Sequence, residues 1–402
     1  MADTNNNKIL NVPNKREQNQ TCSDSAEREG LRPEGNVPNL RFKEFQGEWE
    51  KKSLEEIGDS FIGLTYKPTD VVSEGGLIVF RSSNIQNGCI DYKDIVRVNK
   101  NVKEKLITKK DDLLVCARNG SARLIGKNAI LHEADANQTF GAFMMVFRSD
   151  KNHFVHQLMN TRRYYSQVSE NLGARINQIT SSDLSSFEFF FPTENSEMNK
   201  IVALLDLIDE RIATQNKIIE KYESLIKGIA QNIARNNKPN VLLSECLKCS
   251  SSTLQESDVW ENGTYPVYGA NGIVGYLDDY STEDEAIHII KDGSGVGTVS
   301  YVTGKCSATG TLNTLQAKEG YFLQYLYYLL KIFNFEPYKT GMAIPHIYFK
   351  DYGKAKVFCP SYTEQLRYAR LLSAIDNKLS AEQNIQTNLS LHKQYLLRQM
   401  FI

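Results

Sequence analysis

Several features that mark other classes of protein are absent from this sequence of 402 residues. It has no run of about 18 consecutive apolar residues, which argues against a transmembrane helix. The N-terminal residues MADTNNNKIL lack a basic segment followed by an apolar stretch, so a secretory signal peptide is not expected. The seven cysteines are odd in number and scattered, which favours the reducing cytoplasm over a disulfide framework.

Motifs of common cofactor-dependent enzymes are also missing. The glycines of GSGVG (293–297) lead into TVSYV, which has the composition of a strand, whereas a dinucleotide-binding fingerprint opens a helix. A phosphate-binding loop needs Ser or Thr after Gly304-Lys305, but Cys306 stands there, and Val299 occupies the place of its first glycine. The sequence contains no [DNS]-P-P-[YF] loop, and no DExx box or phosphate-binding loop supports ATP-driven motion. We therefore expect a chain without catalytic activity of its own.

No metal site is indicated either. Cys246 and Cys249 form one C-x-x-C pair, but no second pair and no His pair follows at the spacing of a zinc finger. His153 and His156 lie one helical turn apart, and the sequence points to no third ligand. We expect these residues to be structural, and the chain to hold no metal or cofactor.

The sequence contains a long internal repeat. Residues 173–192 (GARINQITSSDLSSFEFFFP) align without a gap with residues 341–360 (GMAIPHIYFKDYGKAKVFCP). The alignment continues, after the loss of a single position in the second copy, from Leu204-Leu205 to Leu371-Leu372. This unit is far longer than a solenoid repeat, which has about 20–50 residues. We interpret it as a duplicated globular domain followed by a helix.

Two long helices are predicted, over residues 193–237 and 361–402. Their apolar residues recur in alternating steps of four and three, which is typical of a coiled-coil seam. Gln215 is the one polar residue of the first seam. The second seam is more broken, but its polar residue Glu382 lies in the same layer as Gln215, and such a pair can fix the register. The predicted seam residues are Ile201, Leu205, Ile208, Ile212, Gln215, Ile219, Leu372, Ile375, Leu379, Glu382, Leu389 and Leu396.

The rest of the chain divides into an extension and two domains. Residues 1–36 are polar, and we expect them to be disordered. Residues 37–192 and 238–360 contain short β-type runs separated by turn signals, and Asn119-Gly120-Ser121 lines up with Asp292-Gly293-Ser294. The predicted fold is α+β. It has two mainly β domains, each followed by a long helix, the helices forming an antiparallel coiled coil, with an internal pseudo-two-fold repeat.

Charge is distributed unevenly between the two domains. The net charge of the whole chain is −1, which by itself gives no support to nucleic-acid binding. Residues 81–175 carry 16 Lys and Arg against 9 Asp and Glu, whereas residues 239–360 carry 9 against 13. The first domain can therefore neutralise phosphates, while the second has no bulk electrostatic argument for doing so.

Both domains contain loops rich in side chains that read base edges. Arg pairs with guanine, Asn and Gln pair with adenine, and glycine backbone permits close approach to a groove. Asn-Gly and Asp-Gly-Ser segments are more often plain turns, and that alternative stays open for each loop. The candidate DNA-contacting residues are Arg81, Asn84, Gln86, Arg118, Asn119 and Arg123 in the first domain, and Tyr268, Asn271, Lys291, Ser294, Thr298 and Lys339 in the second.

From about residue 37 onward, the chain resembles the specificity (S) subunits of type I restriction–modification systems. VPNLRFKEFQGEWEKKSLEEIG is similar to the first segment of that family, and FRSSNIQNGCI and DLLVCARNGS resemble its first target-recognition domain. TYPVYGANGIVGYL and GMAIPHI resemble versions of its second domain. Pro192…Glu197…LLDLID and Pro360…Glu364…LLSAID resemble the starts of its two helices.

This resemblance implies a non-catalytic, cytoplasmic subunit. Each target-recognition domain is expected to read one half of a bipartite site in double-stranded DNA. The helices are expected to set the spacer and to dock two modification (M) subunits, which supply S-adenosylmethionine chemistry. Two restriction (R) subunits, with ATP and Mg²⁺, can join such a complex.

An alternative is a coiled-coil adaptor whose two β-rich modules bind other proteins. Affinity for specific duplex DNA distinguishes the two hypotheses. The sequence gives neither the recognised bases nor the spacer length, and it does not say whether an R subunit is present or what residues 1–36 do.

Overall fold

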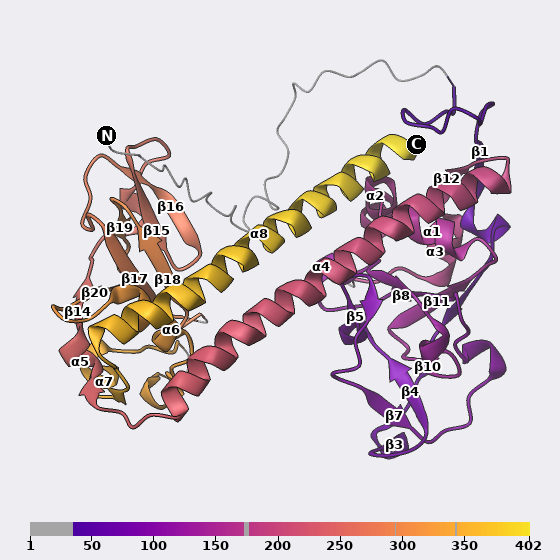
Figure 1. The fold of residues 1–402 in the computed structure, drawn as a ribbon. Coiled ribbons are helices and arrows are strands. Elements are labelled where there is room, and N and C mark those ends of the chain that lie inside the picture. The colour runs from indigo at the N-terminus through magenta and orange to yellow at the C-terminus, as the bar shows by residue number, and fades with distance from the viewer. Residues whose placement is uncertain (1–34, 173–176, 294, 342–343) are drawn as a thin grey trace. The chain divides into compact units, whose positions relative to one another are not determined.

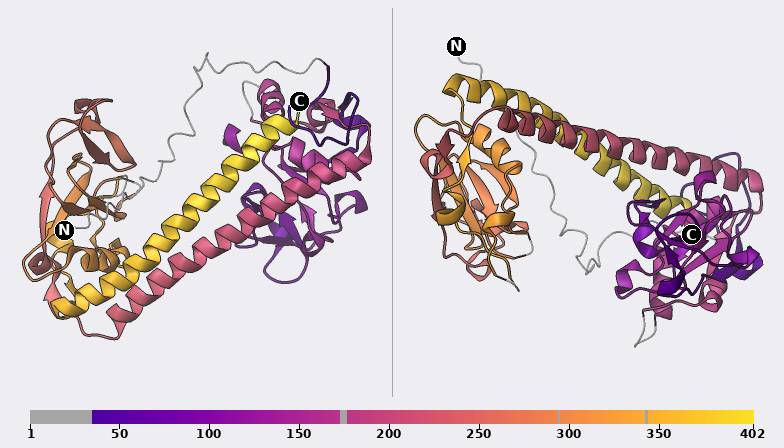
Figure 2. Two further views of the ribbon diagram at one scale, coloured as in Figure 1. Left: turned by 45° about the horizontal axis from the view of Figure 1, so that its top comes forward. Right: turned by 90° about the horizontal axis from the view of Figure 1, so that it is seen from below.

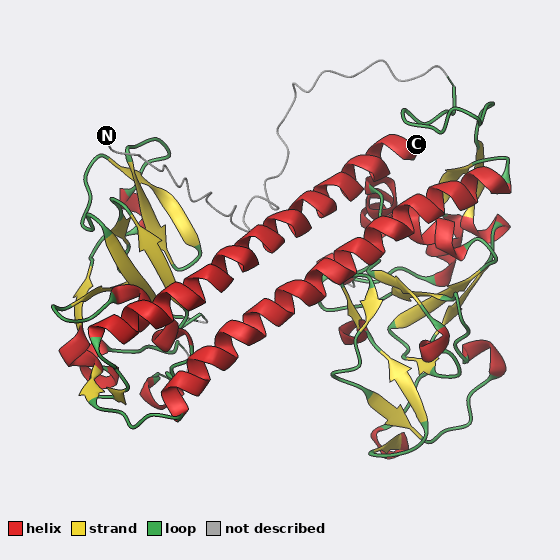
Figure 3. Cartoon of the chain, viewed as in Figure 1, coloured by secondary structure: helices red, strands yellow, loops and turns green. Residues whose placement is uncertain are grey.

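A computed structural model describes residues 35–172, 177–293, 295–341 and 344–402. Most of the expected disordered extension, residues 173–176 of the repeat and the candidate contact Ser294 lie outside these ranges. The chain forms two compact units, and each contains strands and parts of both long helices (Figures 1 and 3). The first unit contains the described residues up to Ala213 together with Thr387–Ile402, and the second contains Thr214–Gln386.

The first unit is built on two four-stranded sheets. One sheet is antiparallel in the order β2-β11-β8-β9, and the other has the order β10-β4-β7-β3, with β10 parallel to β4. The strands of these sheets are β2 (Asp59–Ile62), β3 (Val71–Val72), β4 (Leu77–Phe80), β7 (Val96–Val98), β8 (Leu113–Cys116), β9 (Asn128–Ile130), β10 (Thr139–Phe140) and β11 (Met144–Arg148).

Short pairs and helices complete the first unit. Strand β1 pairs with β12, and β5 forms a hairpin with β6. Their bounds, with those of the helices, are β1 (Glu50–Ser53), β5 (Ile85–Gln86), β6 (Cys89–Ile90), α1 (Asn152–Leu158), α2 (Arg162–Asn171), α3 (Ser181–Ser186) and β12 (Glu188–Phe191). Strand β8 is fully buried, in keeping with its apolar run Leu-Leu-Val-Cys.

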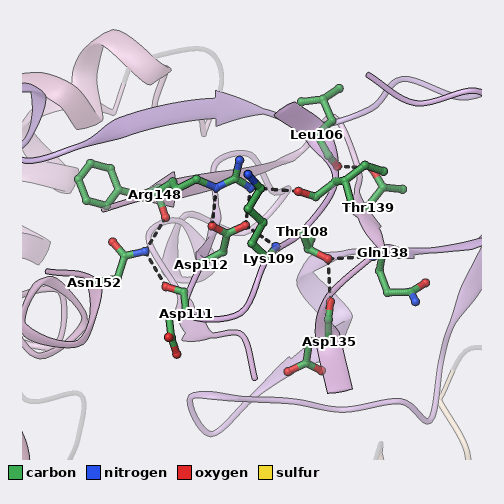
Figure 4. Close-up of polar contacts among 12 residues, drawn as sticks. Leu106, Thr108, Lys109, Asp111, Asp112, Asp135, Gln138, Thr139, Arg148 and Asn152 are labelled. Carbon is green, nitrogen blue, oxygen red and sulfur yellow. Dashed lines mark hydrogen bonds and ion pairs between the residues drawn. The ribbon is translucent and has the colours of Figure 1, made fainter. Parts of the chain in front are cut away.

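A polar network fixes the segment that leads into β8 (Figure 4). The Arg148 guanidinium binds both carboxylate oxygens of Asp112, at 2.7 and 2.6 Å, and also donates to the Ile107 carbonyl at 3.0 Å. Asp112 is buried, and its carboxylate also accepts from the Lys109 amide. Asn152 of α1 donates to the Asp111 and Phe147 carbonyls. The start of β8 is therefore held by charge-assisted hydrogen bonds, which are stronger than neutral ones.

The second unit repeats the plan of the first. Its antiparallel sheet has the order β14-β20-β17-β18, and its second sheet, β16-β15-β19, again contains a parallel pair, β15 with β19. The strands are β13 (Val241–Leu242), β14 (Leu247–Ser251), β15 (Tyr265–Gly269), β16 (Gly272–Leu277), β17 (Glu285–Ile290), β18 (Val299–Thr303), β19 (Ser307–Ala308), β20 (Leu312–Ala317) and β21 (Lys356–Val357). The helices are α5 (Leu243–Cys246), α6 (Leu323–Lys331) and α7 (Phe349–Tyr352).

Both units also include parts of the long helices α4 (Asn195–Arg235) and α8 (Tyr362–Met400). Within each unit these segments lie side by side (Figure 2). In the first unit, α4 residues share a core with the end of α8 (Ile201, Leu205, Leu397, Met400). In the second unit, the later part of α4 packs with the start of α8 (Ile219, Ile226, Leu372, Ile375, Leu379). The pairing is antiparallel, and the predicted fold class with its internal repeat is confirmed.

Most of the seam residues named from the sequence belong to the shared cores or, like Gln215 and Glu382, contact each other. Ile201, Leu205, Gln215, Leu372 and Leu379 are buried. The other members are half-buried: Ile208, Ile212, Ile219, Ile375, Glu382, Leu389 and Leu396. Helix residues therefore belong to the cores of the two units, whereas the predicted domain boundaries assign the helices to segments of their own.

The two polar seam residues contact each other within the second unit. The Gln215 amide donates to the backbone oxygen of Glu382 at 3.1 Å and also to its carboxylate. Gln215 is only 1% exposed, so sliding either helix by one layer would leave its amide without a partner. This pair stabilises one register of α4 against α8.

The joints between the β-rich parts and the long helices are repeated too. In the first unit, Gln157 of α1 donates to Asp206 of α4 at 3.2 Å. In the second, Gln324 of α6 donates to Ser373 of α8 at 3.4 Å. Asp206 and Ser373 are equivalent positions in the alignment that pairs Leu204-Leu205 with Leu371-Leu372, so the same joint is made twice.

A buried carboxylate ties the start of the described chain to α4. Glu197, in the first turn of α4, is 1% exposed and receives two hydrogen bonds from the Arg41 guanidinium, both at 2.7 Å. The Trp49 indole donates to the same carboxylate at 3.3 Å, and its ring packs edge-on against Phe401. The hydrogen bonds between Arg41 and Glu197 raise the pKa of Arg41 above its ordinary value. The charge of Glu197 is thus compensated inside the core.

Replacing Arg41 by Ala is expected to lower the free energy of unfolding of the first unit by about 3 kcal/mol, because it leaves Glu197 buried without a cation. In a Trp260→Phe background, Trp49 is the only tryptophan, and its fluorescence during urea unfolding reports on this unit. Lys43 is exposed, so Lys43→Ala removes the same charge at a cost below about 0.5 kcal/mol. Equal stability of the two variants would contradict the expectation.

His288 is a buried histidine in the second unit. It lies on β17, is 1% exposed, and packs edge-on against Tyr268 with ring centroids 5.5 Å apart. Neither ring nitrogen has a hydrogen-bond partner among the described residues. Burial lowers the pKa of His288 to about 4, so the folded state holds the neutral imidazole.

His288 predicts a loss of stability in mild acid. The unfolded state takes up this proton near pH 6.5 and the folded state only near pH 4, so the contribution is intact above pH 6.5 and falls by about 3 kcal/mol toward pH 4. Urea unfolding followed by circular dichroism at several pH values should show a shallower acid slope for His288→Leu than for the original chain. The matched control is the same substitution at His392, which is exposed.

Candidate nucleic-acid interface

In the first unit, two other segments hold the residues that follow β8. The Ala117 amide donates to the Phe143 carbonyl at 3.0 Å, and the Ala117 carbonyl accepts from the Ile179 amide at 2.9 Å. The Asn119 amide donates to the Asn177 carbonyl at 3.2 Å. These backbone bonds bring together three segments that are far apart in the sequence. We call residues 117–119, 143 and 177–179 the first frame.

The first frame gathers several of the predicted contact residues. Asn119 donates to the Ser82 hydroxyl at 3.0 Å, which joins the frame to the loop after β4. The Arg118 guanidinium lies 4.9 Å from the centre of the Phe143 ring, within cation–π range. Arg118 and Arg123 are both exposed. This part of the unit therefore offers positive charge and a planar donor group to a ligand.

Phe143 was not among the residues predicted from the sequence. Its side chain is 56% exposed, which is unusual for phenylalanine. An aromatic residue after Gly141-Ala142 and directly before the buried strand β11 was the available signal. Its carbonyl completes the frame, while its ring lies under Arg118.

The side chains of Asn84 and Arg81 are engaged in the loop after β4, and for Asn84 this corrects the prediction. The Asn84 side chain is fully buried. Its amide oxygen accepts from the Arg81 backbone, and its nitrogen donates to the carbonyls of Asp91 and Asp94 at 3.0 and 2.9 Å. It has no atom left for a base, so it shapes the loop instead. The Arg81 guanidinium is paired with the Asp94 carboxylate at 2.8 Å.

Gln86 lies at the tip of the β5–β6 hairpin and is exposed. The two turn residues, Asn87 and Gly88, have φ values of 52° and 76°, the left-handed region that Asn-Gly turns favour. The Gln86 amide nitrogen donates to the Ser83 carbonyl at 3.0 Å. Its exposed position leaves the amide oxygen accessible from solvent.

The second unit contains an equivalent arrangement after β17. The Lys291 amide donates to the Thr311 carbonyl at 3.0 Å, and the Lys291 carbonyl accepts from the Ile347 amide at 2.9 Å. The Gly293 amide donates to the Pro345 carbonyl at 3.0 Å. We call residues 291–293, 311 and 345–347 the second frame.

The matching bonds define which residues are equivalent in the two frames. Ala117 corresponds to Lys291, Phe143 to Thr311 and Ile179 to Ile347. Asn119 therefore corresponds to Gly293, which corrects the sequence alignment of Asn119 with Asp292. The alignment slipped because the turn that follows is shorter in the second unit. In the first unit, the Gly126 amide donates to the Cys116 carbonyl and closes the turn. In the second, the Gly297 amide donates to the Ile290 carbonyl.

Four other predicted residues of the second unit lie outside its frame. Tyr268 is half-buried, burial raises the pKa of its phenol, and its carbonyl accepts from the Thr309 amide at 2.8 Å. Asn271 is exposed in the turn between β15 and β16. Thr298 closes the turn after β17 through its backbone. Lys339 is paired with Glu336 at 2.5 Å.

The described residues contain no group of three or more His, Cys, Asp or Glu side chains placed to hold a metal ion. Within the same residues, no helix combines the length and the apolar character that crossing a membrane requires.

Comparison with known proteins identifies the family. Residues 46–224 and 244–391 match the family described as type I restriction modification DNA specificity domain. These two matches cover most of the chain and coincide with its two copies of the fold. The chain belongs to this family of type I specificity subunits.

Individual relatives are distant. The chain is 27% identical over 198 residues to the EcoKI specificity subunit of Escherichia coli K12, covering 46% of this chain and 42% of that protein. It is 24% identical over 252 residues to a putative specificity subunit of Mycoplasma genitalium, covering 57% of this chain and 65% of that protein. Each match thus spans less than two thirds of the relative.

A solved structure shares the fold. The S subunit of a type I restriction–modification system from M. genitalium superposes with a TM-score of 0.62 at 19% identity. The superposition covers 91% of this chain and 99% of that one. At this identity the likeness concerns the fold alone.

Proposed function

We propose that this chain is the DNA sequence-specificity subunit of a type I restriction–modification complex. Each frame, with the loops around it, reads one half of a bipartite site in double-stranded DNA. The chain itself carries out no chemistry. The observation that carries this proposal is the duplicated frame, because two equivalent recognition surfaces in one chain suit a target with two halves.

The polar groups on the two frames support base recognition. Arg118 and Asn119 in the first frame are side chains that pair with purine edges in the major groove. The acidic balance of the second domain implies that other subunits contribute phosphate contacts there. Phosphate contacts position a protein on DNA, whereas base contacts specify the sequence.

The proposal includes two M subunits that dock on the long helices. Exposed apolar residues on a helix whose packed seam is already buried are available to contact a further subunit. In the first unit, Leu207 of α4 is 65% exposed and Leu391 of α8 is 56% exposed. In the second, Leu225 is 47% exposed and Leu371 is 50% exposed. We assign these residues to M-subunit contacts.

The complex would work in the cytoplasm, where genomic DNA is accessible. S-adenosylmethionine would bind the M subunits, and ATP and Mg²⁺ would bind R subunits where these are present. None of these cofactors is assigned to this chain.

The test is single-molecule mapping of DNA methylation in cells that contain the cognate M subunits. A bipartite methylated motif should require this chain, and exchanging residues 37–192 for the corresponding domain of another specificity subunit should change one half-site only. An unchanged methylation pattern after deletion of the chain would refute the proposal. It would favour the adaptor hypothesis if the chain then also lacks affinity for specific duplex DNA.

We also propose that the helices set the spacer length. Seven residues inserted into both helices, after Ala213 and after Gln386, preserve the heptad phase and add about 10 Å at 1.5 Å per residue. The spacer of the methylated motif should lengthen by about three base pairs, at about 3.4 Å each, with both half-sites unchanged.

The control is the same insertion in α4 alone. It puts the seam out of register beyond the insertion and should abolish assembly with the M subunits. A double-insertion variant that assembles and methylates at the original spacing would contradict the spacer proposal, while leaving the specificity proposal intact.

A further inference from the structure

The two frames carry side chains of opposite charge at the same position. Arg118 forms a backbone bridge with Gln178, and Asp292 forms the equivalent bridge with His346. Both residues lie one position beyond the amide that bonds to the Phe143 or Thr311 carbonyl. The Arg118 amide also donates to the Phe143 carbonyl. Because the residues before and after positions 118 and 292 make matching backbone bonds, the two side chains leave equivalent points of their domains.

The surroundings of the two side chains are adapted to their charges. In the first frame, the Arg118 guanidinium lies over the Phe143 ring. In the second, Thr311 replaces the aromatic residue, and the Asp292 carboxylate is 2.6 Å from Nδ1 of His346. The backbone of His346 is fixed in turn by two hydrogen bonds with Thr340, at 2.7 and 2.9 Å. Asp292 and His346 are both about one third exposed, so the pair is accessible from solvent.

An aspartate on a DNA-reading surface has few favourable targets. Its carboxylate only accepts hydrogen bonds, and it is repelled by phosphates. The major groove also exposes hydrogen-bond acceptors, which cannot bind a carboxylate: O6 and N7 of guanine and O4 of thymine. The donors exposed there are the exocyclic amino groups, N4 of cytosine and N6 of adenine.

We propose that positions 118 and 292 are equivalent specificity-determining positions that read opposite hydrogen-bonding patterns. Arg118 donates to a guanine in one half-site. Asp292, oriented by His346, accepts from the exocyclic amino group of a cytosine or adenine in the other. This inference rests on the proposed function and adds the chemical class of base that each domain requires.

Single-residue truncations test the assignment by methylation mapping in the cognate complex. Arg118→Ala should relax one guanine position in one half-site, with a roughly ten- to hundredfold loss of discrimination there. Asp292→Ala should relax one cytosine or adenine position in the other half-site by a similar factor. Relaxation of a different class of base, or of no position, would overturn the inference.

Grafting the first arrangement onto the second domain is a stronger test. The triple variant Asp292→Arg, Thr311→Phe, His346→Gln reproduces the side chains of Arg118, Phe143 and Gln178. The half-site read by the second domain should then require guanine at the position that Asp292→Ala relaxes. The other half-site and the spacer should not change.

The matched control is Glu261→Arg, which changes the charge by the same amount in the same domain. Glu261 is exposed and follows Trp260, which bridges to Tyr276 near the end of the β15–β16 hairpin opposite its Gly269–Gly272 turn. This variant should keep the original motif. If the triple variant fails to assemble with the M subunits, Asp292→Ala still decides the question.

The outcomes separate the two proposals. A methylated motif that does not depend on this chain at all would refute the proposed function. A motif that depends on the chain but is unaffected at both half-sites by the position 118 and 292 variants would refute only the present inference.

Discussion

The whole structure depends on burying the apolar seams of α4 and α8. Neither helix is apolar on all sides, and most of the stability of such a helix in a protein comes from packing its apolar face. Each β-rich unit offers part of that partner, and each unit in turn needs helix residues to close its own core. The helices and the β-rich parts therefore stabilise each other through shared cores.

Polar contacts decide how this burial is arranged. An apolar seam alone tolerates sliding, but Gln215 has its partner only when it lies opposite Glu382. Glu197 fixes the start of α4 because its buried charge accepts hydrogen bonds from Arg41 and Trp49. In both cases the cost of an unpaired buried group, rather than the strength of the bond, selects the arrangement.

Duplication explains why the two recognition surfaces are comparable and still different. The backbone bonds of the frames are made by atoms that every residue except proline possesses, so they persist while side chains change. The side chains at positions 118 and 292, 143 and 311, and 178 and 346 are free to diverge in charge and shape. A fixed scaffold with variable contacts is an economical way to obtain two specificities from one fold.

The sequence by itself determined the long helices, the polar layer in their seam, the mainly β character of the domains and the repeat, because periodicity and internal similarity are properties of the chain order. Of the candidate contact residues that it indicated, Arg118, Asn119 and Lys291 lie on the frames. Only the tertiary structure decided that Asn84 is buried, that Phe143 is exposed, and that Arg118 corresponds to Asp292. The last of these facts depends on backbone bonds between segments that are distant along the chain, such as Ala117 with Ile179. The burial of Asn84 depends on the side-chain hydrogen bonds that it makes with Arg81, Asp91 and Asp94 in the folded loop.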